Sequence, residues 1–286
     1  MSKIRRSRPV VPSTGMALVA VLWTVAILSM VVTGVSTMVK QEIRGVGDLR
    51  QGVIAEASAM AVSNLVLQEI GAQTRPLHKL VWQTRNFGGQ SIRVLIQPVS
   101  GLIDLNKAPE RLLTSLYQYG GAPFDVATQL ARATVLRRER AAERGQGMPF
   151  AAVEDLLRVP GVDYDLYAKI FRDLTVDSET TGRVNPFAAT LGVVSVLTGG
   201  NSAAAQQFVQ SRDLNDEVAD STGLNGEFTD RSSSGRLRLE AWVPLPDGRQ
   251  WVSERVVVLQ TGEAGEIPWK ILHTERRIVV SGPGSR

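Results

Sequence analysis

The amino-acid sequence predicts an α+β protein with a long N-terminal helix, antiparallel strands, and a large block of shorter helices set between those strands. Three observations predict this class. The residues from Met16 to Val39 are uncharged and continue without proline into a second helical stretch. The middle of the chain has helical periodicity interrupted by glycine pairs, and the chain after Arg236 alternates apolar and polar residues as strands do.

The uncharged segment is long enough to cross a membrane. Its 24 residues form a helix of about 36 Å, and the hydrocarbon core of a bilayer is about 30 Å thick. Residues 1–15 carry four basic side chains and no acidic one, and such flanks stay in the cytoplasm. The sequence therefore predicts a single-pass protein with a cytoplasmic N-terminus and the rest of the chain outside. An ordinary cleaved secretory signal is not indicated, because no small-residue cleavage site follows Val39.

Gly15 stands at the junction between the basic residues and the uncharged helix. A basic leader that ends in glycine directly before such a helix resembles the type IV prepilin signal. In that class a prepilin peptidase removes the leader and the helix stays on the mature protein. The resemblance implies cleavage between Gly15 and Met16, with methylation of the new N-terminus as a further feature. A plain membrane anchor, with Gly15 as a loop residue, is the alternative on this segment alone.

Residues 40–75 are predicted to be the amphipathic half of the same helix. Apolar residues recur there in steps of three and four, which is the spacing of one helical face. We expect this stripe to pack on a globular head, and a coiled-coil stalk is the alternative. The predicted stripe consists of Val39, Ile43, Val46, Leu49, Val53, Ala57, Ala61 and Leu65, and polar residues including Glu56 are placed on the other face.

Strands are predicted on both sides of the helical block. Residues 76–104 contain the turn signal Gly88-Gly89, a strand over Ser91–Gln97 and a short strand over Leu102–Leu105. Residues 221–286 contain three more. Arg236–Pro244 and Gln250–Gln260 form a predicted hairpin, and Pro268–Val280 a final strand.

The helical block is predicted over residues 105–220. Asn106 is expected to cap its first helix, with Pro109 in the first turn, and Asn185 with Pro186 is expected to open a later one. A glycine pair follows each asparagine at the same distance, at Gly120-Gly121 and Gly199-Gly200. These matching helix–glycine–helix units suggest an internal duplication.

Nucleic acid is not favoured as a partner. The segment Leu156–Val162 resembles a helix-hairpin-helix turn, which presents backbone N–H groups to DNA phosphates, but Pro160-Gly161 also suits a tight turn between packed helices. The net charge of +4 resides in the leader, and the chain after Gly15 has 28 basic and 28 acidic residues. The basic residues around Arg138 alternate with Glu139 and Glu143, as on a solvated helix face.

No catalytic or cofactor motif is found. The chain has no cysteine and two histidines, His78 and His273, which stand in unrelated segments. The phosphate-binding loop, the serine nucleophile elbow and the zinc-protease motif are all missing from the sequence. We therefore expect a protein that is not an enzyme and has no cofactor. Calcium remains an option at one acidic loop, although the EF-hand glycine is missing there; its oxygen donors are Asp213, Asp216, Glu217 and Asp220.

The order of these segments resembles the type II secretion system protein K family, the largest of the minor pseudopilins. Three segments carry the resemblance: STGMALVAVLWTVAILS, LIDLNKAPERLL, and VEDLLRVPGVD followed by GRVNPFAAT. It implies a pilin-like fold, in which a long helix and an antiparallel sheet carry an inserted helical domain with helix-hairpin-helix or SAM-like repeats. It also implies a role in capping the tip of the periplasmic pseudopilus and in starting its assembly, for export of folded proteins.

The resemblance also implies partners and a location. The partners are the I- and J-type minor pseudopilins, the prepilin peptidase and the inner-membrane secretion platform, and the location is the bacterial inner membrane with the globular part in the periplasm. Most pilins carry glutamate at the fifth mature position, but counting from Met16 gives Ala20, as is typical of this family. Small residues of the helix would allow close helix packing; they are Ala17, Ala20, Ala26, Ser29 and Gly34. The alternative function is a membrane-anchored DNA-binding protein of the competence type.

Overall fold

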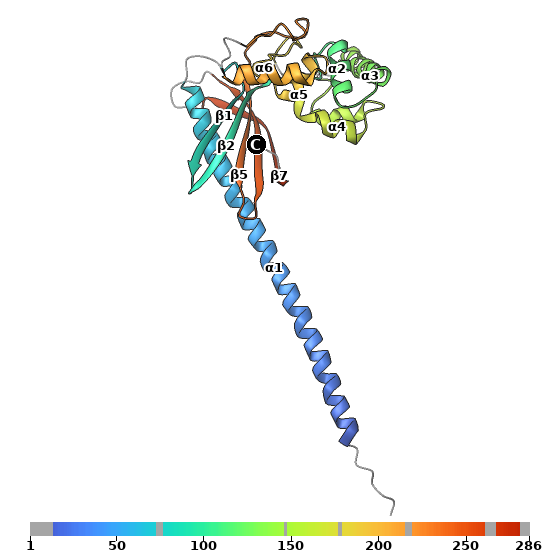
Figure 1. Ribbon diagram of the computed structural model, residues 1–286, viewed down its shortest axis with the longest axis vertical. Helices are drawn as coiled ribbons and strands as arrows, with labels where there is room; N and C mark the ends of the chain where they lie inside the picture. Colours follow the sequence, from blue (N-terminus) through green and yellow to red (C-terminus); the bar gives the residue numbers. More distant parts are fainter. Residues whose placement is uncertain are drawn as a thin grey trace, which may run out of the picture. The chain divides into compact units, whose positions relative to one another are not determined.

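The computed structural model describes residues 14–72, 77–145, 148–176, 179–214, 219–260 and 267–280, and the side chains of residues 14–17, 31–48 and 280 lie outside this description. The chain divides into two compact units, Met1–Ile54 and Ala55–Arg286. Helix α1 spans Thr14–Gly71, so its first part belongs to the first unit and its last part to the second (Figure 1).

The second unit contains a five-stranded antiparallel sheet with the strand order β1-β2-β5-β6-β7. The strands are β1 (Val81–Phe87), β2 (Gln90–Pro98), β5 (Arg236–Pro244), β6 (Arg249–Leu259) and β7 (Trp269–Val280). Four of them lie within one residue of the predicted positions, and β1 is a strand that the sequence pattern did not reveal. The turn between β1 and β2 consists of Gly88 and Gly89, both with positive φ (58° and 77°). This two-glycine turn is the type that matches the twist of a hairpin.

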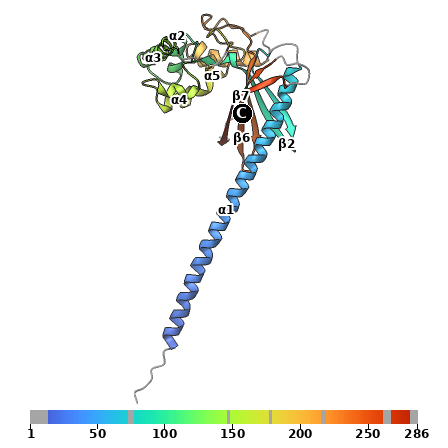
Figure 2. The same cartoon turned by 180° about the vertical axis from the view of Figure 1, so that it is seen from behind.

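One face of this sheet packs against α1 and forms the first hydrophobic core. In β5 the side chains that point to the helix are Leu237, Leu239, Ala241 and Val243, all buried, as the alternation predicts. Ile92, Val94 and Ile96 of β2 continue the same layer. In Figures 1 and 2 the last part of α1 runs along the strands on this side.

The face of α1 that packs on the sheet is not the predicted one. The side chains that point into the core form what we call the buried stripe: Ala55, Ala59, Val62, Val66 and Ile70, each at most 5% exposed. The predicted core residue Leu65 is 47% exposed, and Ala57 is exposed as well. The prediction was wrong because this part of α1 has two apolar stripes at helical spacing, and the one with small and β-branched residues is buried.

A block of short helices lies between β2 and β5 in the sequence, at one end of the sheet (Figure 2). Its longer helices are α2 (Glu110–Tyr119), α3 (Phe124–Glu143), α4 (Tyr164–Ile170), α5 (Leu191–Leu197) and α6 (Ser202–Leu214). Its short elements are the 3₁₀ helices η1 (Val99–Gly101), η2 (Val153–Arg158) and η3 (Phe171–Asp173), and the parallel strand pair β3 (Ile103–Asp104) and β4 (Leu174–Thr175). Both helix–glycine–helix units are present, as α2–α3 and α5–α6.

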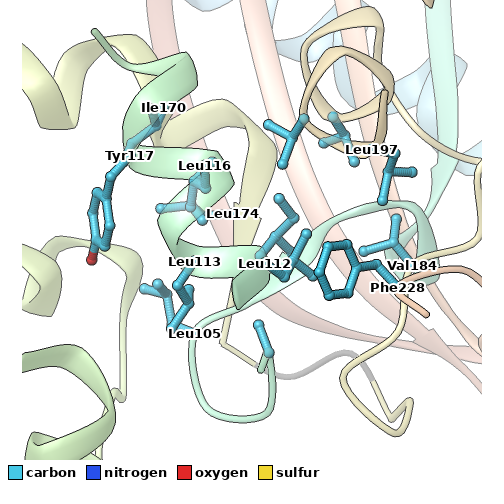
Figure 3. Packing of buried hydrophobic residues seen from close by; sticks show 14 of the residues in the cluster. Leu105, Leu112, Leu113, Leu116, Tyr117, Ile170, Leu174, Val184, Leu197 and Phe228 are labelled. Carbon is cyan, nitrogen blue, oxygen red and sulfur yellow. The ribbon is translucent and has the colours of Figure 1, made fainter. Parts of the chain in front are cut away.

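The helical block has a second hydrophobic core of its own. Leu112, Leu113 and Leu116 of α2 are fully buried at its centre, and the cluster reaches from Ile103 to Phe228 in the sequence (Figure 3). The Tyr117 hydroxyl is buried there and hydrogen-bonds the Thr134 hydroxyl of α3 at 2.7 Å. Because buried polar groups need such partners, this bond satisfies both hydroxyls inside an otherwise apolar cluster.

Candidate functional site

The first unit contains an apolar helix segment whose described side chains are exposed. Within α1, Leu18–Met30 is an apolar stretch whose large side chains are exposed, Trp23 by 65% and Met30 by 80%. The predicted small residues Ala20, Ala26 and Ser29 are exposed in the same stretch. Gly15, Met16, Ala17 and Gly34 belong to α1, but their side chains lie outside the description. Soluble proteins rarely expose a continuous apolar surface of this size.

By length and composition, Leu49–Gly71 is the segment that could cross a membrane among the residues whose side chains are described. Much of that segment, however, is the part of α1 that covers the sheet. Its buried stripe and the polar residue Glu56 are already in contact with strands. A segment held in this way is a core helix, so the apolar stretch around Leu18–Met30 is the better membrane candidate.

The second unit also leaves one side of α1 uncovered. The apolar side chains there form what we call the free stripe: Ala57, Met60 and Leu65, which are exposed, and Ala61, which is half-buried. Met60 is 44% and Leu65 47% exposed. On a helix these positions lie on one side, about 200° around the axis from the buried stripe. Apolar side chains aligned in this way can pack on a helix of another protein.

Glu56 joins α1 to two strands of the sheet. Its carboxylate accepts hydrogen bonds from Trp251 Nε1 at 3.1 Å and from Ser253 Oγ at 3.4 Å. It also pairs with Arg255 of β6 at 3.4 Å and with Arg276 of β7 at 3.2 Å. Sequence reasoning placed Glu56 on the outer face and missed this network. The signal was present in β6, where Arg255 alternates with Trp251 and Val257 on the face that packs against the helix.

The environment of Glu56 favours its charged form. Burial alone would raise the pKa of the Glu56 carboxyl, but the Trp251 hydrogen bond and the positive charge of Arg276 outweigh burial, so the pKa lies below its usual value of 4.5. Arg255 is the buried member of the pair, with a side chain only 3% exposed. The charged form of Glu56 therefore stabilises the contact between helix and sheet.

Asn106 ties loops together and caps no helix. Its Nδ2 donates to the carbonyls of Phe150 at 2.9 Å and Val176 at 2.7 Å, and its Oδ1 accepts from the Phe150 N–H. Helix α2 begins at Glu110, so Pro109 is its N-cap residue and does not lie inside the first turn as predicted. The predicted cap was wrong because the same amide that can cap a helix also matches a carbonyl and an N–H in nearby loops.

Asn185 has the corresponding role nearer the sheet. It is 1% exposed, and its Nδ2 donates to the carbonyls of His78 at 2.8 Å and Ser232 at 3.1 Å. Its Oδ1 accepts from the Phe187 N–H. The following helix, α5, begins later, and its cap is Thr190. Neither Asn185 nor Pro186 starts a helix, and the predicted start was wrong for the same reason as at Asn106.

A buried polar chain joins the outer face of the sheet to the helical block. Gln97 of β2 donates to the Ala188 carbonyl at 2.9 Å and accepts from the Arg238 guanidinium, and Arg238 donates to the Arg172 carbonyl at 2.7 Å. Gln97 and Arg238 are at most 5% exposed. Because all three connections are satisfied inside the protein, the block is held at a defined place on the sheet.

A cavity of about 320 Å³ lies beside this polar chain, between the helical block and strands β5–β7. Tyr167 is its most perturbed side chain. Burial and the carboxylates of Glu154 and Glu275 raise the pKa of Tyr167 to about 12, so the phenol stays protonated at neutral pH. Glu254, in the same wall, pairs with Arg277 at 3.0 Å. Glu254 is therefore engaged in an ion pair, and the Tyr167 phenol keeps its proton.

The segment that resembles a helix-hairpin-helix turn is used for packing. Leu156, Val159 and Val162 are buried in the core of the helical block. Two basic residues of the neighbouring cluster have structural partners: Arg138 donates to the Ala108 carbonyl at 2.9 Å, and the Arg137 guanidinium lies over the Phe150 ring. These contacts favour the packing interpretation over a nucleic-acid surface.

The predicted calcium donors are only partly visible. Asp213 pairs with Arg212 at 2.9 Å, and Asp220 accepts from the Thr222 N–H. Asp216 and Glu217 lie outside the described residues. Within the described ranges, no group of three or more acidic or histidine side chains is arranged to hold a metal ion.

No protein-family model and no curated protein matches the sequence. A solved structure does match: a chain from the crystal structure of the GspK–GspI–GspJ complex of the type 2 secretion system of enterotoxigenic Escherichia coli. The TM-score is 0.51 at 14% identity, and the match covers 82% of this chain and 99% of that chain. The predicted resemblance to the protein K family is thereby confirmed as a likeness of fold.

The hydrogen bonds of the buried Asn185 side chain predict how an isosteric substitution changes stability. Asn185→Asp keeps the acceptor for Phe187 but removes the donors to His78 and Ser232. We expect it to lower the free energy of unfolding by about 2–4 kcal/mol, because a carboxylate oxygen at this buried position would face two carbonyl oxygens in place of a donor. Denaturant unfolding measures this. The control is Asn201→Asp, whose exposed side chain only accepts from Ala204, and equal losses in both variants would contradict this role of Asn185.

The lowered pKa of Glu56 predicts a pH dependence. Since the folded pKa lies below the unfolded value of 4.5, the stabilisation is complete above about pH 4.5 and is lost as the pH falls through the folded pKa. Glu56→Gln should cost roughly 1.5–3 kcal/mol at pH 7, as expected for charge-assisted hydrogen bonds.

Urea unfolding of the parent and of Glu56→Gln at pH 7 and at pH 3 tests this dependence. The difference between the two proteins should shrink at the lower pH. A difference that stays constant would show that the charge of Glu56 contributes nothing.

Proposed function

We propose that this chain is a minor pseudopilin of a type II secretion system, which caps the tip of the periplasmic pseudopilus and helps to start its assembly. The fold likeness carries the proposal, because the match to a chain of the GspK–GspI–GspJ complex extends over 99% of that chain. Because the match also covers 82% of this chain, it extends beyond the long helix into the sheet and the helical block.

The exposed apolar part of α1 supports a role in assembly. A helix that is apolar on all sides over Leu18–Met30 is stable in lipid or among other helices, but not in water. Transfer from lipid to a helical bundle gains nothing from hydrophobicity, so close packing must drive it. Ala20, Ala26 and Ser29 are small enough to allow such packing. The proposed location is the bacterial inner membrane, with the helix inserted and the globular part in the periplasm.

The missing glutamate supports the tip position. Counting from Met16, the fifth residue is Ala20, which is exposed on α1. In pilins that carry it, a glutamate at this position pairs with the amino terminus of a neighbouring subunit. A subunit without the carboxylate cannot make this pair with a subunit ahead of it, and it is suited to the end of a filament. Burying an unpaired carboxylate would also be costly in lipid.

The proposal predicts how the N-terminus is processed. In cells with an active prepilin peptidase, the mature protein should begin at Met16, and a Gly15→Leu variant should keep its leader. Mass spectrometry of the purified full chain measures the N-terminal mass and shows any methyl group on Met16. An intact leader in the parent protein would contradict processing as a pseudopilin.

The free stripe predicts a loss of partner binding. Leu65→Lys places a charge at a 47% exposed apolar position, so it should leave folding intact but weaken co-purification with I- and J-type minor pseudopilins by about tenfold or more, in the range of interface hot spots. The control is Leu136→Lys on α3, a 43% exposed leucine far from α1 in the sequence. Undiminished co-purification of the Leu65 variant would remove the free stripe from the interface.

A further inference from the structure

The second unit uses a helix segment that has two apolar sides. The buried stripe and the free stripe lie on nearly opposite sides of α1, about 200° apart at 100° per residue. Both contain alanine together with larger apolar residues, namely Val62, Val66 and Ile70 on one side and Met60 and Leu65 on the other. The attraction between apolar surfaces has no direction, so it discriminates weakly between the two ways of laying this helix on the sheet.

The charged residues of the same segment are arranged asymmetrically. Ala55–Gly71 contains two charged side chains, Glu56 and Glu69. They flank the buried stripe, roughly 60–80° to either side of its centre. Glu56 reaches β6 and β7, and Glu69 pairs with Arg85 of β1 at the opposite edge of the sheet. The helix is therefore held on both sides of the stripe that it buries.

The arginines of the two ion pairs differ in how much they need the glutamate that the helix supplies. Arg85 and Glu69 are 36% and 51% exposed, so water can replace either partner. Arg255 is 3% exposed and lies on the inner face of the sheet, opposite Leu239. Its partner carboxylate is Glu56. A helix turned to its other side would leave the Arg255 guanidinium buried without a counter-charge, which is the costly way to break a buried pair.

We infer that Glu56 selects the side of α1 that packs on the sheet, and thereby determines that the free stripe, Ala57, Met60, Ala61 and Leu65, faces away from the sheet. Glu56 is in this sense a positioning residue. It is not part of the free stripe, and it acts by placing a carboxylate beside Arg255 in only one rotation of the helix. A single buried polar group that fixes register in this way is known in coiled coils.

Single thiols test the inference in the full chain, held in detergent micelles, because the parent sequence has no cysteine. Ser63→Cys reports the packed side, where Ser63 is 1% exposed and its hydroxyl has no hydrogen-bond partner. Ala57→Cys reports the free side. In the parent background, maleimide should label Cys at 63 at least about tenfold more slowly than Cys at 57, because a buried thiol reacts only after local opening.

Combining each thiol with Glu56→Ala should bring the two rates together, with the thiol at 63 labelled faster and the thiol at 57 more slowly than in the parent background, because neither rotation of the helix then gives Arg255 a counter-charge. Glu69→Ala, the matched control, should leave the order unchanged. If the thiol at 63 stays protected and the thiol at 57 stays reactive in the Glu56 variant, the inference is overturned. Fast labelling at both positions would also overturn it, if the circular dichroism spectrum shows that the protein is still folded.

A second variant decides the matter if Glu56→Ala fails to fold. Glu56→Leu combined with Arg255→Met removes the buried charge together with its counter-charge, so the selection should be lost without an unpaired ion. Both thiols should then label at intermediate rates, and a labelling pattern equal to the parent's would overturn the inference. The test involves no secretion partner, so its failure would leave the proposed pseudopilin function standing.

Discussion

The contact between the last part of α1 and the inner face of the sheet is the interaction on which the second unit depends. Strands β2 and β5 bury alternate apolar residues on that face, and without a helix to cover them the sheet would expose its core. The layer of side chains between the helix and the sheet is thin, because the buried stripe consists of alanine and β-branched residues. Small side chains bring the helix axis close to the strands, so that Glu56 can reach donors on two of them.

The helical block is attached to this core by polar contacts. Gln97, Arg238 and Asn185 are all buried and use their hydrogen-bonding groups across the junction with backbone carbonyls. Apolar contacts fill each of the two cores, and directional contacts set how the cores meet. This division suits a protein whose helical block has to stand in a defined place at the end of a sheet, since hydrogen bonds impose geometry where hydrophobic burial does not.

Sequence periodicity predicted the elements well where the pattern is governed by a single core. The strands β5, β6 and β7 and the alternation of Leu237 and Leu239 are examples. Sequence periodicity failed where the same local pattern fits two different structures. The stripe through Ala57 and Leu65 is as regular as the buried one, and the carbonyls that accept from the Asn106 and Asn185 side chains lie 44 to 107 residues away. β1 escaped notice because it is an edge strand, with side chains half-exposed on both faces.

The order of strands in the sheet has a consequence for how the protein matures. β2 pairs with β5, so that Arg93 lies opposite Trp242 and the whole helical block is looped out between them. The block can collapse early on its own leucines, but the sheet cannot close until the C-terminal strands have been synthesised. Pairings of such long sequence separation form slowly. Until then the buried stripe of α1 has no sheet to pack on and stays exposed to solvent.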